Sequence, residues 1–99
     1  MVYYFCKQKG ACYMETRVAV ISLIVTEPEA VESLNGILHT YSNYIIGRMG
    51  LPYREKHVNI ICVAVDAPQD VISAMSGKLG LLAGVSAKTA YSNVVSKEE

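Results

Sequence analysis

The fold is decided by two stretches of sequence that match each other, RVAVISLIVTEPEAV at residues 17–31 and HVNIICVAVDAPQDV at residues 57–71. The second stretch follows the first at an offset of 40 residues. Identical pairs at this offset include Val18/Val58, Ile21/Ile61, Val25/Val65, Pro28/Pro68, Val31/Val71 and, just beyond the two stretches, Ser33/Ser73. Repetition at a fixed offset indicates two copies of one supersecondary unit.

Each copy is predicted to begin as a strand and to continue as a helix. The β-branched runs at 17–25 and 57–65 are typical of strands. The pairs Thr26–Glu29 and Asp66–Gln69 then have the spacing of a capping box, in which a short side chain caps one end of a helix. A proline follows in each first turn, where its missing N–H costs nothing. We therefore expect helices over residues 27–39 and 67–79.

Helical spacing also predicts which helix residues face the core. In the first helix these are Val31, Leu34, Leu38 and Tyr41, and in the second they are Val71 or Ile72, Met75 and Leu79. Gly80 and Gly84 would allow the chain to leave the second helix.

A second strand is expected at the end of each copy, over residues 44–53 and 85–94. Gly47, Gly50 and Pro52 predict that the first of these is bulged. The resulting order, βαββαβ, is typical of an α+β ferredoxin-like sandwich, an antiparallel sheet with two helices on one face. We assign this domain to residues 14–95, with an N-terminal extension at 1–13 and a polar, frayed tail at 96–99.

The two first strands are apolar on both of their faces. In residues 17–25, Val18, Val20 and Ile24 alternate with a second apolar set, and residues 57–65 repeat this pattern. Because helices can cover only one face of the sheet, the other face needs a different cover. We expect an obligate homo-oligomer, a dimer or tetramer, and the alternative is a single subunit covered by its own N-terminal segment.

Composition restricts the partners and the compartment. Nine Lys and Arg balance nine Asp and Glu among 99 residues, so the net charge is zero. Nucleic-acid binding normally needs a basic excess, so no direct nucleic-acid contact is expected. The longest apolar run, residues 18–25, is too short to cross a membrane, and the N-terminus lacks the pattern of a signal peptide. We expect a cytoplasmic protein.

Candidate metal ligands are few and widely spaced. They are Cys6, Cys12, His39, His57 and Cys62, without CxxC, HxH or HExxH spacing. No nucleophile motif of the G-x-S-x-G type occurs either. We predict no metal, no catalytic residue and no enzyme, and no cofactor can be named. A metal or redox sensor stays open as an alternative, as does an enzyme such as an acylphosphatase, although its N-terminal anion loop is missing.

The most unusual stretch is IIGRMGLPYRE at residues 45–55. Glycines permit close approach of the backbone, and an arginine offers a fixed fork of donors to a carboxylate or phosphate. We predict that Arg48, Gly50 and Tyr53 bind a small effector together with Glu27 and Asn35, where the first strand meets the first helix. The other interpretation is a bulged strand and turn with a structural ion pair.

Residues 14–91 resemble the family of regulators of the iron-only hydrogenase system. The resemblance rests on METRVAV at 14–20, IIGRMGLPYRE at 45–55, DAPQDVI at 66–72 and SGKLG at 76–80. It implies a ferredoxin-like fold similar to ACT domains and to the C-terminal domain of the nickel-responsive repressor. Such domains assemble through their sheets and bind small effectors between subunits.

The resemblance to the nickel-responsive repressor has limits. Where that domain carries an HxH element, this chain has Arg48-Met-Gly-Leu51, so nickel binding is not implied. The chain also has no room for a DNA-binding element. The resemblance therefore implies a non-enzymatic, oligomeric, effector-binding module linked to the iron-only hydrogenase system, and the metal or redox sensor is the alternative.

Overall fold

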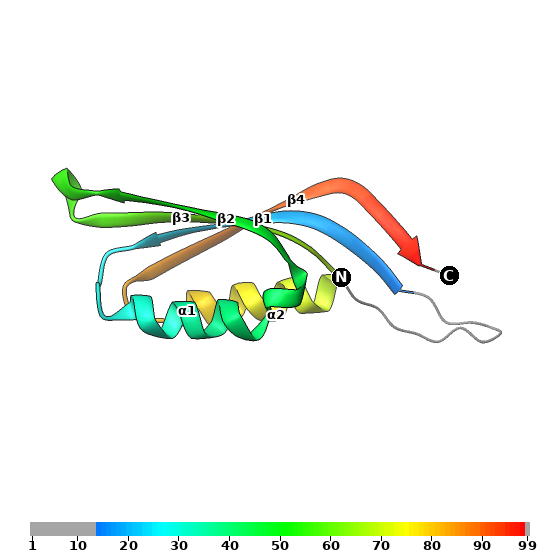
Figure 1. The fold of residues 1–99 in the computed structure, drawn as a ribbon, viewed down its shortest axis with the longest axis horizontal. Helices are drawn as coiled ribbons and strands as arrows, with labels where there is room; N and C mark the ends of the chain where they lie inside the picture. The colour runs from blue at the N-terminus through cyan, green and yellow to red at the C-terminus, as the bar shows by residue number, and fades with distance from the viewer. Residues whose placement is uncertain (1–13, 99) are drawn as a thin grey trace.

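The computed structural model describes residues 14–98 of the chain (Figure 1). Its elements follow the order expected from the repeat. They are β1 (Met14–Val25), α1 (Ala30–Thr40), the 3-10 turn η1 (Ser42–Tyr44), β2 (Ile45–Tyr53), the 3-10 turn η2 (Arg54–Lys56), β3 (Val58–Ala67), α2 (Gln69–Gly80) and β4 (Val85–Glu98).

All four strands form one antiparallel sheet in the order β2-β3-β1-β4. The strands that open the two repeats, β1 and β3, therefore lie side by side in the centre, with Ile21 opposite Val63. Figure 1 shows both helices beneath one face of this sheet. The predicted ferredoxin-like sandwich is confirmed.

The core lies between the sheet and the helices. From β1, every second residue from Ala19 to Val25 is buried, and the same alternation continues in β3 from Ile61 to Ala67. In α2 the buried positions are those that helical spacing predicted, whereas in α1 only Leu34 and Leu38 are, because Val31 and Tyr41 are partly buried and Ala30 was not predicted. The buried helix residues are Ala30, Leu34 and Leu38 from α1, and Ile72, Met75 and Leu79 from α2.

The predicted capping boxes are wrong. Neither α1 nor α2 has a side-chain hydrogen bond at its N-cap, which is Glu29 in α1 and Pro68 in α2. The Thr26 hydroxyl instead donates to the carbonyl of Gly84 at 3.2 Å, and the Thr26 N–H donates to the same carbonyl at 2.8 Å. Thr26 therefore joins the end of β1 to the start of β4 rather than opening a helix.

The bulge predicted in β2 is present. Ile45 pairs with Val65 and Gly47 with Ala64, so Ile46 is the extra residue. A second irregularity lies between β1 and β4, where Arg17 pairs with Val95 but Ala19 pairs with Tyr91.

The expected end of β4 is wrong. The strand continues to Glu98, because Ser96, Lys97 and Glu98 pair with Thr16, Glu15 and Met14. Figure 1 shows this end of β1 and β4 bending away beyond the helices.

The face of the sheet opposite the helices is apolar, and no described segment lies over it (Figure 1). We call it the outer face. Large side chains stand exposed on it, including Val20 (38%), Ile24 (46%) and Met49 (62%). The alternation of the strands adds further members to this face, which are Val18, Leu51, Tyr53, Val58, Ile60, Cys62 and Ala64. Its described charged residues within the strands are Asp66 and Lys88, and the carboxylate of Glu55 reaches it at the hairpin tip.

Candidate functional site

Arg48 and Asn35 meet across the sheet–helix boundary. Arg48 pairs with Val63, a core residue, so its side chain leaves β2 on the helix side. One guanidinium nitrogen, Nη1, donates to the amide oxygen Oδ1 of Asn35 on α1 at 3.1 Å. Both side chains are exposed to solvent. The contact fixes the direction of the guanidinium and leaves most of its five N–H groups available.

A pocket of about 450 Å³ opens beside this contact. Its walls come from the second half of α1, from η1 and from the bulged start of β2. The described lining residues are Asn35, Leu38, His39, Ser42, Ile45, Ile46, Gly47 and Arg48. We call it the Arg48 pocket. None of these residues is acidic, so the guanidinium gives the pocket a positive character.

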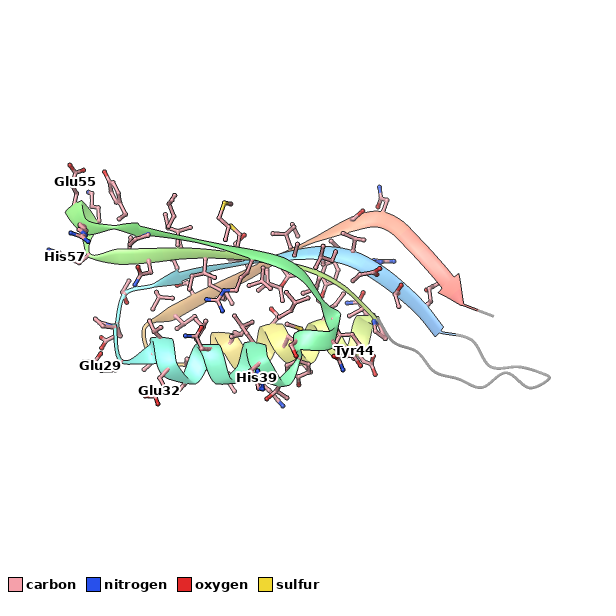
Figure 2. The ribbon with its side chains drawn as sticks, viewed as in Figure 1. Glu29, Glu32, His39, Tyr44, Glu55 and His57 are labelled. Carbon is pink, nitrogen blue, oxygen red and sulfur yellow. The ribbon has the colours of Figure 1, made fainter. Side chains whose placement is uncertain are left out.

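Ser42 and His39 belong to the Arg48 pocket although sequence reasoning did not place them there. Asn35, His39 and Ser42 follow at helical spacing, so they share one stripe of α1 and its extension. That spacing is the signal that could have identified them. Figure 2 shows His39 near the C-terminal end of α1, at the solvent side of the helix.

Glu27, predicted to bind ligand with Arg48, lies elsewhere. It packs against Gly84, the turn residue before β4, so closely that a side chain at position 84 would collide with its Cγ. It also lines a separate hollow of about 200 Å³ with Ser33 and Leu82. Glu27 therefore lies beside the turn that joins α2 to β4.

Gly50 and Tyr53 also lie outside the Arg48 pocket. Gly50 pairs with Ile61 in β2 and its Cα faces open space. Tyr53 pairs with Val58 on the outer face, and its hydroxyl donates to Oε1 of Glu55 at 2.6 Å. Of the five predicted binding residues, the structure brings only Asn35 and Arg48 together.

The Tyr53–Glu55 hydrogen bond changes the acidity of the tyrosine. Because the Glu55 carboxylate accepts a hydrogen bond from the neutral phenol and disfavours a second negative charge beside it, the pKa of Tyr53 is raised above its ordinary value. We expect Glu55→Gln to lower the pKa of Tyr53 toward that value. An NMR pH titration of the Tyr53 ring, assigned with Tyr53→Phe, measures this. Glu32→Gln, on exposed α1, is the control, and an unchanged pKa in Glu55→Gln would contradict the assignment.

A second hollow lies on the outer face and borders the Arg48 pocket. It has about 460 Å³ and is lined by Val20, Gly47, Arg48, Met49, Cys62 and Ala64. Gly47 and Arg48 therefore line hollows on both sides of the edge strand β2. Met49 and Cys62 are direct partners in the β2–β3 register.

The described metal-ligand candidates do not converge. His39 lies at the end of α1, and His57 follows η2 at the far tip of the β2–β3 hairpin (Figure 2). Cys62 lies on the outer face, by its register with Met49. Within residues 14–98, no three His, Cys, Asp or Glu side chains gather at a distance suited to one metal ion. Cys6 and Cys12 lie outside the described residues. No described helix has the length and apolar character needed to span a bilayer.

Comparison with known proteins identifies the family. Residues 17–89 match the family model described as "TM1266-like: Iron-only hydrogenase system regulator, putative". The chain belongs to this family. The match runs from β1 into β4, so it includes the Arg48 pocket and the outer face. The resemblance seen in the sequence is thereby confirmed for the family, while the ACT-like relationship stays a prediction.

A solved structure supports the same relationship. The chain is similar to the uncharacterized protein TM1266 from Thermotoga maritima, with 35% sequence identity and a TM-score of 0.74. The similarity covers 77% of this chain and 96% of that protein. Among curated proteins, none matches the chain.

Proposed function

We propose that this member of the family is a non-enzymatic regulatory module of the iron-only hydrogenase system, working in the cytoplasm as a homo-oligomer that binds a small effector. The observation that carries this proposal is the uncovered outer face. Val20, Ile24 and Met49 stand exposed on it, although apolar side chains of this size normally find cover. A second copy of the chain supplies that cover.

The size of the outer face suits an interface. The area of the outer face can be estimated from four strands spaced by ~4.8 Å, each about eight residues long at a rise of ~3.3 Å per residue. These dimensions give roughly 500 Å² per subunit. Two such footprints bury about 1,000 Å², which is near the lower limit for a specific interface. Because the described charges at this face are few, with Asp66 and Lys88 within the strands, Arg48 beside the outer hollow and Glu55 at the hairpin tip, little desolvation of charge opposes the contact.

The effector part of the proposal is supported by the Arg48 pocket. Arg48 is held by Asn35 and makes no ion pair within residues 14–98. Since Gly47 and Arg48 also border the outer hollow, a ligand on one side of β2 lies next to the surface that a second subunit would cover. This arrangement suits a module whose assembly responds to a ligand. The zero net charge supports a small molecule or a protein as partner, without nucleic acid or membrane.

The reactivity of Cys62 tests the covered face. With Cys6→Ser and Cys12→Ser, Cys62 is the one thiol left, and it lies on the outer face. We expect it to react with a thiol reagent at least about tenfold more slowly than in the same protein carrying Val20→Glu, because the second subunit excludes the reagent, and a carboxylate near the thiol does not itself speed the reaction. The reaction is followed by absorbance of the released chromophore.

A matched control separates the interface from general effects. Ser73→Cys, placed on the exposed side of α2 in a Cys62→Ala background, should react equally fast with and without Val20→Glu. Equal rates for Cys62 in both backgrounds would contradict the proposal, because the outer face would then be open in the native protein.

A further inference from the structure

We infer that the Arg48 pocket binds a small monocarboxylate whose apolar body occupies the wall formed by α1 and the β2 bulge. This inference rests on the proposed function and names the chemical class of its effector. Three features of the pocket carry it: the charge that Arg48 supplies, the apolar residues beside that charge, and the position of the pocket at the end of α1.

The charge of the pocket favours an anion with one negative charge. Arg48 is the permanently charged group among the described lining residues, and none of them is acidic. Its Nη1 donates to Asn35, which leaves the other N–H groups of the planar fork for a ligand. Two parallel N–H groups of a guanidinium match the two oxygens of a carboxylate. The hydroxyl of Ser42 adds a neutral donor to the same pocket.

The apolar part of the lining favours a ligand with a hydrocarbon body. Leu38 and Ile45 face the pocket from the core side, and Ile46, the extra residue of the bulge, is 63% exposed there. A ligand that contacts Ile46 removes apolar surface from water, which favours binding by ~25 cal/mol per Å². Inorganic anions cannot make this contact.

The position of the pocket on α1 disfavours a phosphate. Leu38 and His39 belong to the last turn of α1, which ends at Thr40. The carbonyl groups of that turn make the C-terminal end of a helix partially negative. Phosphate sites in proteins use the opposite end, where backbone N–H groups point at the ligand. The single guanidinium of Arg48 can balance one negative charge. A dianion would therefore keep an unbalanced charge beside the negative end of α1, whereas the charge of a monocarboxylate is balanced by Arg48 alone.

The test is an NMR titration of the ¹⁵N-labelled full chain with butyrate as the probe and inorganic phosphate as its comparison. We expect butyrate to shift the side-chain amide signals of Asn35 and the backbone amide of Gly47 in a saturable way. Phosphate should need at least about a tenfold higher concentration for the same shift. Arg48→Gln should abolish the butyrate response. Arg48→Lys keeps the positive charge but lacks the two parallel N–H groups of the guanidinium, so it should weaken the response.

The control variant is Arg54→Gln, because Arg54 is an exposed arginine in η2 at the hairpin tip. It should leave the butyrate response unchanged. If phosphate shifts the same signals as readily as butyrate, the ligand class is wrong and the pocket remains an anion site. If neither probe gives a saturable shift that depends on Arg48, both the proposed ligand class and the proposed effector site are wrong. The Cys62 measurement then still tests, independently, whether the chain forms an oligomer.

Discussion

Val20→Lys is expected to separate the assembly into single folded subunits. Val20 lies on the central strand β1, opposite Ala64 and Ala90 and far from any edge of the outer face. In a symmetric dimer the change places two ammonium groups in the interface, and their desolvation costs several kcal/mol. We expect the dissociation constant of the dimer to rise by at least about 100-fold, equivalent to ~2.8 kcal/mol. Sedimentation velocity across a dilution series measures this change.

The fold itself should survive this substitution. Val20 is 38% exposed in the single subunit and points away from the core, so a lysine there remains solvated once the subunits separate. Circular dichroism should be unchanged. Ser73→Lys, on the exposed side of α2, is the matched control and should leave the assembly intact. If Val20→Lys sediments like the wild-type protein, the outer face is not the interface.

Gly84→Ala is expected to cost about 2–5 kcal/mol of the free energy of unfolding. Gly84 has φ +79°, a backbone conformation that costs an alanine about 1–2 kcal/mol. A Cβ at this position would also collide with Glu27, and overpacking typically adds about 1–3 kcal/mol. The turn has little freedom to move, because the carbonyl of Gly84 accepts both hydrogen bonds from Thr26.

Chemical denaturation at one fixed protein concentration measures this loss. Gly77→Ala is the control, because it lies exposed in α2 with nothing near the position of a Cβ. It should stabilise the protein by about 0.5–1 kcal/mol through helix propensity. A Gly84→Ala protein with wild-type stability would show that the turn relaxes and that the Glu27 contact is not a constraint.

The fold was predictable because its signals are local and repeated. The apolar runs at 17–25 and 57–65 and their matching offset predicted the two central strands, but both faces of these strands are apolar, so the structure was needed to show that the set from Ala19 to Val25 faces the helices. The start of α1 was mispredicted because the Thr26 hydroxyl donates to Gly84, a residue distant in sequence, and the start of α2 because Asp66 lies within β3. The continuation of β4 to Glu98 was likewise not visible, because it depends on pairing with the start of β1.

The candidate site was only partly predictable. Arg48 and Tyr53 are five positions apart on one strand, so strand alternation alone places them on opposite faces of the sheet. Glu27 precedes α1 and Asn35 lies in its middle, so the length of the helix separates them. The contact between Arg48 and Asn35 depends on how α1 crosses the edge strand, which no local pattern encodes.

The most direct test of the account is the mass of the native particle. Sedimentation equilibrium of the wild-type chain at micromolar concentration should give a multiple of 10.8 kDa, a dimer or tetramer, because the outer face is covered by another copy. A particle of 10.8 kDa that stays monodisperse at that concentration would contradict the account.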